Sequence, residues 1–229
     1  MSVPVFLHTA VDSVQVGDAV VLTDAEGRHA VSALRVSVGE VVDLVDGSGN
    51  RARCVVESIT GRDTCTVQVS ARSADAEPAL RFVVAQALLK GEHDERAIDL
   101  LTQVGVDAII PLQVERCVVR WDAERETRGR ARWQAASGAA ARQSRRARWP
   151  IIDASLTVDG VANLCRTVEL ALLLDPYAQV PIGNLQMPAS GTVLIIVGPE
   201  GGFTEGEAAR MLAQGAQPVR LGEEVLRGS

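Results

Sequence analysis

Residues 193 to 207 read Val-Leu-Ile-Ile-Val-Gly-Pro-Glu-Gly-Gly-Phe-Thr-Glu-Gly-Glu, the most informative stretch of the chain. Its five leading apolar residues predict a strand buried on both faces, because an unbroken run of this kind has no solvent side. Thr204 and Glu207 have the spacing of a capping box, which predicts that a helix begins there. A glycine-rich loop between such a strand and helix is typical of a ligand site at the carboxyl edge of a sheet.

The loop itself carries glycines that favour a ligand. Gly198, Gly201 and Gly202 can take positive φ and can let a ligand approach the backbone closely, while Pro199 fixes its own φ. Many glycine-rich turns bind nothing, so an ordinary turn stays as the alternative. The sequence has no Gly-Lys-Ser/Thr after the loop and no G-x-G-x-x-G, which argues against a P-loop and against the dinucleotide fingerprint.

Composition narrows the class of protein. With 229 residues and 47% hydrophobic content, the chain can bury the core of one large or two small domains. No apolar run approaches the roughly 20 residues of a membrane span, and the N-terminus lacks a signal-peptide pattern, so a cytoplasmic protein without a membrane partner is expected. The four cysteines are far apart and the three histidines isolated, so we expect neither a metal site nor a disulfide framework.

Charge is distributed unevenly along the chain. The net charge is −6, yet residues 116–148 hold ten arginines and three acidic residues. Within a helix predicted at 130–148, Arg142, Arg145 and Arg146 fall on one face beside Gln143. Such a run is commonly a solvated face, and the alternative is contact with nucleic-acid phosphates, which arginine matches bidentately. Lys90 and Arg116 flank predicted strand ends and are further candidates for RNA contact.

Two domains are predicted. Short alternating runs at residues 19–22, 41–45, 52–56 and 65–69, separated by turn sequences, indicate a small β-barrel. The polar, proline-terminated residues 73–78 are typical of a linker. We therefore place one domain at 1–72 and the second at 73–229.

The second domain alternates strands and helices. Strands are predicted at 80–88, 108–112, 168–174, 193–197 and 219–221, and helices at 92–104, 130–148 and 205–214. This alternation predicts an α/β fold with a mostly parallel sheet.

Several short motifs, taken together, resemble a known family. They are Gly198-Pro199-Glu200-Gly201-Gly202, Leu221-Gly222, Val225-Leu226-Arg227, Glu115-Arg116-Cys117 and the run Ala-Arg-Gln-Ser-Arg-Arg at 141–146. In this order and spacing they resemble the RsmE family, the 16S ribosomal RNA uridine-N3 methyltransferases of the SPOUT class. Residues His29, Leu34-Arg35, Gly39 and Asp46-Gly47 resemble that family's PUA-like barrel, so the resemblance covers nearly the whole chain.

The resemblance implies a trefoil-knotted α/β domain that binds S-adenosyl-L-methionine (SAM), normally as a homodimer, and a PUA-like domain that binds RNA, with Arg35 among its contacts. The implied partner is 16S rRNA or the small ribosomal subunit. By the same resemblance, the cofactor-binding residues are Gly198, Pro199, Glu200, Gly201, Gly202, Leu221, Gly222, Val225 and Leu226. Leu174 and Asp175, at the end of a predicted strand, match the pocket more loosely.

Methylation at uridine N3 requires an unpaired or flipped-out base that gives up the N3 proton. SAM supplies the methyl electrophile, so the protein mainly supplies position and electrostatics. Arg227 is expected to stabilise negative charge on a uracil oxygen. Glu200 is a candidate proton acceptor, with bracing of the loop as its alternative role, whereas Glu205 is more simply a favourable acid in the first turn of a helix.

The chain departs from the family after Arg227. The family continues Thr-Glu-Thr-Ala and a closing helix, whereas this sequence reads Gly228-Ser229. The natural product is expected to be longer, and the alternative is that the protein has lost the segment that completes the knot. Two other function classes stay open. A non-catalytic RNA-binding assembly factor would bind RNA but no SAM, and an unrelated nucleotide-binding enzyme would use the same loop.

Overall fold

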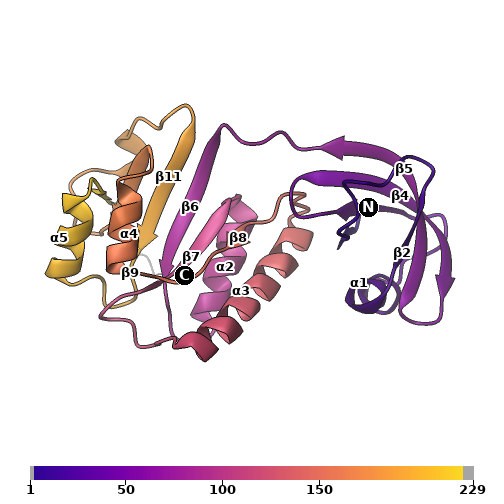
Figure 1. Cartoon of the computed structure of the whole chain (residues 1–229), viewed down its shortest axis with the longest axis horizontal. Helices are drawn as coiled ribbons and strands as arrows, with labels where there is room; N and C mark the ends of the chain where they lie inside the picture. Colours follow the sequence, from indigo (N-terminus) through magenta and orange to yellow (C-terminus); the bar gives the residue numbers. More distant parts are fainter. Residues whose placement is uncertain (1–2, 224–229) are drawn as a thin grey trace. The chain divides into compact units, whose positions relative to one another are not determined.

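The computed structural model describes residues 3–223 of the chain. It divides into two compact units between Glu77 and Pro78, except that Ala141–Trp149 belongs to the first unit (Figure 1). The predicted boundary after residue 72 falls inside a strand that continues to Ala74. The assignment of functional domains to 1–72 and 73–229 stays a prediction.

The first unit is built on a five-stranded sheet in the order β1-β3-β4-β5-β2. Its elements are β1 (Val5–Leu7), β2 (Ala19–Leu22), α1 (Asp24–Arg28), the π-helical turn η1 (His29–Ala33), β3 (Val41–Val45), β4 (Asn50–Thr60) and β5 (Thr64–Ala74). The four predicted strands are confirmed, although β4 and β5 are longer than expected. All five strands contribute side chains to one core, in which Phe6, Leu22 and Leu44 are fully buried.

The second unit is built on a seven-stranded sheet in the order β12-β10-β11-β6-β7-β8, with β9 beside β7. Its strands are β6 (Leu80–Ala87), β7 (Ala108–Gln113), β8 (Ile151–Ile152), β9 (Leu156–Thr157), β10 (Leu170–Leu174), β11 (Gly191–Val197) and β12 (Gln217–Val219). Every pairing in this sheet is parallel, which confirms the predicted α/β class.

Four helices accompany this sheet: α2 (His93–Val104), α3 (Ala123–Gln143), α4 (Val158–Cys165) and α5 (Glu205–Ala213), with a 3-10 turn, η2 (Ile182–Asn184), before β11. Helix α2 ends as predicted at Gly105, whose φ of 103° is left-handed. Helix α4 was not predicted, although the Thr157 hydroxyl caps its start by accepting a hydrogen bond from the Gly160 amide.

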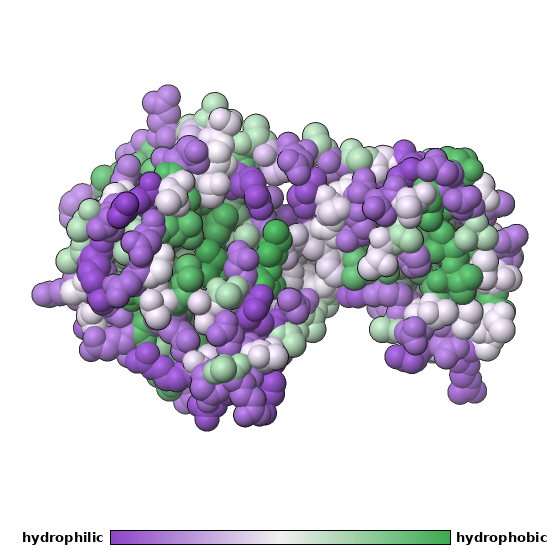
Figure 2. All heavy atoms as spheres, in the orientation of Figure 1, coloured by the Kyte–Doolittle hydropathy of each residue, from purple (hydrophilic) through white to green (hydrophobic). Residues whose placement is uncertain are grey.

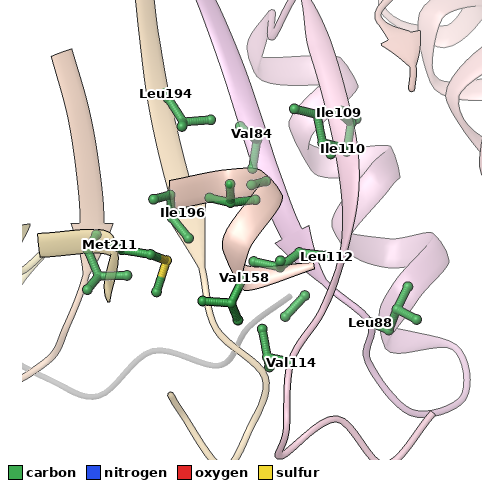
Figure 3. Packing of buried hydrophobic residues seen from close by; sticks show 14 of the residues in the cluster. Val84, Leu88, Ile109, Ile110, Leu112, Val114, Val158, Leu194, Ile196 and Met211 are labelled. Atoms are coloured by element: carbon green, nitrogen blue, oxygen red, sulfur yellow. The ribbon is translucent and has the colours of Figure 1, made fainter. Parts of the chain in front are cut away.

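The helices bury their apolar faces in one core with the sheet. Figure 3 shows Leu194 and Ile196 of β11 in the same cluster as Val158 of α4 and Met211 of α5. Elsewhere hydrophilic side chains cover much of the visible face of each unit (Figure 2). No helix within residues 3–223 is both long and apolar enough to cross a bilayer.

The predicted start of the long helix was wrong. The sequence suggested residue 130, but α3 begins at Ala123, where the Asp122 carboxylate accepts a hydrogen bond from the Arg125 amide at 2.9 Å. Gly129 lies inside α3, where glycine is required because the Trp121 ring packs where a Cβ would lie.

The predicted end was also wrong. Helix α3 stops at Gln143 because the Arg145 amide donates to the Arg142 carbonyl at 3.1 Å, and the Arg146 amide donates to the Ala141 carbonyl at 2.9 Å. These two hydrogen bonds form a Schellman motif, in which the residue after the cap is left-handed. Arg145 takes that conformation, with φ of 58°. The three arginines therefore do not share one face of a continuous helix.

Candidate active site

The strand β11 lies in the middle of the parallel sheet, between β10 and β6 (Figure 1). Its Val193, Leu194 and Ile196 are buried, as the apolar run predicted. Because these strands are parallel, their carboxyl ends meet at one edge, where ligands bind in open α/β sheets. The loop at residues 198–203 leaves β11 at that edge and leads directly into α5.

One of the three loop glycines uses the left-handed conformation that glycine allows. Gly202 has φ of 66°, whereas Gly198 and Gly201 do not lie in the positive region. Those two positions are instead limited by space. A Cβ on Gly198 would lie 3.0 Å from the Phe203 ring, and one on Gly201 would lie 3.4 Å from the Cβ of Arg116.

A buried carboxylate anchors the far end of the loop. The predicted capping box is confirmed, since the Glu207 carboxylate accepts the Thr204 amide at 2.9 Å and the Thr204 hydroxyl accepts the Glu207 amide. Glu207 is 3% exposed and also accepts the Glu115 amide at 2.7 Å. Burial alone would raise its pKa, but these amide hydrogen bonds hold the pKa of Glu207 below its ordinary value.

Arg116 lies against the same loop. It follows β7, and its Nη1 donates to the Gly201 carbonyl at 2.8 Å. Sequence reasoning named Arg116 only as a candidate RNA contact. The hydrogen bond to Gly201 could not be predicted from the sequence, because Arg116 follows β7 and Gly201 follows β11, two strands far apart along the chain.

The ends of β10 and β12 lie next to one another. The Asp175 amide donates to the Val219 carbonyl at 2.9 Å, directly after Leu174. β12 is followed by Leu221 and Gly222, which are exposed and partly exposed. Since β10 also pairs with β11, the predicted cofactor residues on these three strand ends share one edge of the sheet. Val225, Leu226 and Arg227 lie outside the described residues.

A second buried acid, which the sequence analysis missed, lies where β6 leads into α2. Asp94 is 1% exposed, and its Oδ1 accepts the Leu89 amide at 2.7 Å. Burial raises the pKa of Asp94, and the nearby charge of Glu200 acts in the same direction, whereas the Leu89 amide and Arg132 oppose the shift. The sequence signal that could have identified Asp94 is an acidic residue in the first turn of a helix that directly follows a strand.

Asp94→Asn is expected to stabilise the protein at pH 7 by roughly 1 kcal/mol, since it removes a costly buried charge and keeps the acceptor for Leu89. Because the pKa of Asp94 is raised in the folded protein, protonated Asp94 contributes to stability at pH values below the ordinary pKa of an aspartate. That contribution is lost as the pH rises through the folded-state pKa. The stabilising difference should therefore shrink toward zero near pH 3, as measured by urea unfolding. A variant less stable than the wild type at both pH values would contradict this expectation.

The basic residues predicted to bind RNA fall into two sets. Lys90 and Arg116 are exposed in the second unit, while Arg35, Gln143 and Arg145 are exposed in the first. Arg142 is less available, because its guanidinium pairs with Glu26 and lies 5.2 Å from the centre of the Trp149 ring. Arg146 is half-buried.

Several arginines of the 116–148 segment are paired with acids. Arg125 pairs with Asp122 at 3.6 Å and Arg128 with Glu124 at 3.4 Å, while Arg132 reaches Glu95 at 3.2 Å. The segment is therefore less available for phosphate than its composition indicated.

The described residues hold no cluster of His, Cys, Asp or Glu suited to a metal ion. All four cysteines are buried and free. Burial raises the pKa of each thiol, which makes them poor nucleophiles.

Comparison with known proteins finds two matching family models. Residues 76–229 match an RNA methyltransferase domain, and residues 14–70 match an RNA methyltransferase PUA domain. The chain is 39% identical over 224 residues to the ribosomal RNA small subunit methyltransferase E of Mycobacterium bovis, covering 96% of this chain and 85% of that protein. It is 26% identical over 216 residues to the protein of the same name from Bacillus subtilis, covering 90% and 83%.

Solved structures resemble the chain over almost its whole length. A putative methyltransferase from Legionella pneumophila, in complex with SAM, is 26% identical, with a TM-score of 0.88 and coverage of 100% of this chain and 93% of that one. A ribosomal RNA small subunit methyltransferase E from Neisseria gonorrhoeae, bound to SAM, is 27% identical, with a TM-score of 0.86 and coverage of 99% and 92%. The predicted fold class is confirmed, while the knot stays a prediction.

Proposed function

The chain belongs to the RsmE family of ribosomal RNA methyltransferases, and from that premise we propose that it transfers the methyl group of SAM to N3 of a uridine in 16S rRNA of the small ribosomal subunit. The observation that carries the proposal is the meeting of three strand ends, those of β10, β11 and β12, at one edge of the sheet. Each of these three strand ends is followed by, or includes, residues that we propose bind the cofactor.

The residues at this edge fit SAM. At Gly202 a Cβ would meet no atom within 4 Å, so the loop backbone is open to a ligand there. Leu174 is partly exposed and Leu221 is 50% exposed, which suits an adenine ring that needs apolar contact. The proposed cofactor-binding set is Leu174, Asp175, Gly198, Pro199, Glu200, Gly201, Gly202, Leu221, Gly222, Val225 and Leu226.

SAM supplies the methyl electrophile, and the protein's residues prepare the nitrogen that receives it. We assign Glu200, exposed at the tip of the loop, to accept the N3 proton. Arg227 is assigned to stabilise the negative charge that deprotonation leaves on a uracil oxygen. The base must be unpaired, because pairing would occupy N3 in a hydrogen bond.

RNA recognition is assigned to Arg35, which lies in the stretch that matches an RNA methyltransferase PUA domain, to Lys90 and to the basic segment at residues 142–146. Arg35, Gln143 and Arg145 are exposed and so available to phosphate, with Arg142 and Arg146 contributing less. We further propose that the protein acts as a homodimer in the cytoplasm, as the family resemblance implies.

Methyl transfer from labelled SAM to small ribosomal subunits and to free 16S rRNA tests the function directly. We expect one methyl group per molecule of 16S rRNA, and nuclease digestion with mass spectrometry should locate it on uridine N3. Binding of RNA without binding of SAM would instead identify an RNA-binding assembly factor.

Arg145→Gly should weaken RNA binding without lowering stability. Glycine relieves left-handed strain of roughly 1 kcal/mol at φ of 58°, which offsets its greater freedom in the unfolded chain. Loss of one phosphate contact should reduce the slope of log K against log salt by about 0.9. The control is Arg166→Ala, which replaces an exposed arginine of the second unit at the end of α4. An unchanged salt slope in Arg145→Gly would remove Arg145 from the RNA-binding set.

A further inference from the structure

The loop after β7 contacts the proposed cofactor loop at two points. The Glu115 amide donates to Oε1 of Glu207 at 2.7 Å, and Arg116 Nη1 donates to the Gly201 carbonyl at 2.8 Å. The first contact is partly buried and lies in the first turn of α5, whereas the second is exposed and lies in the cofactor loop. The two loops are thus joined by hydrogen bonds at Gly201, within the cofactor loop, and at Glu207, in the first turn of α5.

The loop after β7 is itself firmly held. Val114, Cys117 and Trp121 belong to the main core of the second unit. The Trp121 amide donates to the side-chain oxygen of Gln113 at 2.9 Å, and Arg120 donates to the Glu115 carbonyl at 2.7 Å. Arg116 therefore extends from a backbone with little freedom to move, and its contact can restrain the more open cofactor loop.

The side chain of Arg116 also explains the glycine at position 201. A Cβ there would lie 3.4 Å from Cβ and 3.5 Å from Cδ of Arg116, so the arginine stem runs directly over the glycine. Because Gly201 does not have positive φ, its backbone conformation does not demand glycine. What a larger residue would disturb is the position of Arg116.

We propose that Arg116 is a positioning residue for methyl transfer, which holds the loop at residues 198–202 in its cofactor-binding conformation through the Gly201 carbonyl. This inference rests on the proposed function and deepens it. A guanidinium suits the task because it stays charged at all working pH values and presents several fixed donors. The role differs from phosphate contact, which the sequence alone suggested for this arginine.

The test compares Arg116→Met with the wild type in calorimetric titrations of SAM without RNA and of RNA without SAM. We expect SAM affinity to fall by about tenfold, the worth of a hydrogen bond to a charged group. In steady-state assays KM for SAM should rise while KM for RNA stays constant. Arg116→Lys, which keeps the charge and one donor, should recover part of the SAM affinity.

Arg128→Met is the matched control, because Arg128 is an exposed arginine that pairs with Glu124 on its own helix, away from the cofactor loop. It should change neither affinity. Gly201→Val should reproduce the loss of SAM affinity by displacing Arg116, and combining it with Arg116→Met should cost less than the two single losses together. Such non-additivity would show that Arg116 and Gly201 act through the same contact, even if either single variant is also less stable.

An opposite pattern would overturn the inference. If Arg116→Met binds SAM as the wild type does but shows a salt slope for RNA reduced by about 0.9, Arg116 is a phosphate contact instead. If the wild type itself binds no SAM, the proposed function fails, and this role fails with it.

Discussion

Gly202→Val should abolish measurable SAM binding, the largest loss expected from any single substitution in the loop. Gly202 has φ of 66°, a conformation that costs most L-residues roughly 1–2 kcal/mol and a β-branched residue more. The new side chain would also project into open space beside the loop, where we place the cofactor. Together these effects should weaken SAM binding by at least about a hundredfold in calorimetric titration.

Gly206→Ala is the matched control for this loss. Gly206 lies in the first turn of α5, only four residues away, and a Cβ there would meet no atom within 4 Å. Alanine favours a helix over glycine by roughly 1 kcal/mol, so this variant should be slightly more stable and bind SAM normally. Normal SAM binding by Gly202→Val would show that the loop does not hold the cofactor.

Glu207→Gln should cause the largest loss of stability among these variants, roughly 1–3 kcal/mol at pH 7. The carboxylate accepts amides from two separate loops, those of Thr204 and Glu115, and is almost fully buried. A glutamine side chain offers one oxygen in place of two, so one amide would face an NH₂ group and remain unsatisfied. Urea unfolding with a constant m-value measures the difference.

The pH dependence of Glu207→Gln follows from the lowered pKa. Because the pKa of Glu207 is lowered in the folded protein, its carboxylate contributes to stability at pH values above the ordinary pKa of a glutamate. That contribution is lost as the pH falls through the folded-state pKa. The difference between wild type and Glu207→Gln should therefore be largest at neutral pH and disappear in acid. At neutral pH, Asp94→Asn is expected to raise the free energy of unfolding, whereas Glu207→Gln is expected to lower it. The two variants together therefore distinguish a buried carboxylate that its hydrogen bonds stabilise from one whose buried charge destabilises the fold.

Local sequence patterns predicted the elements that depend on neighbouring residues. The apolar run at 193–197 forms the central strand, and Thr204 with Glu207 forms the predicted cap. Prediction failed at the end of α3, because a left-handed arginine at position 145 closes a motif that usually uses glycine. No local pattern distinguishes such an arginine from one that continues the helix.

The α/β class, the order of most strands and helices and the family resemblance could all be predicted from the amino-acid sequence, because hydrophobic period, caps and ordered motifs are local or linear properties. Three contacts became visible in the folded chain alone: Arg116 reaches Gly201, Glu207 accepts the Glu115 amide, and Asp94 is buried. The physical reason is that parallel strands bring together loops distant in sequence, and hydrogen bonds and burial between such loops depend on strand order, which no local pattern encodes.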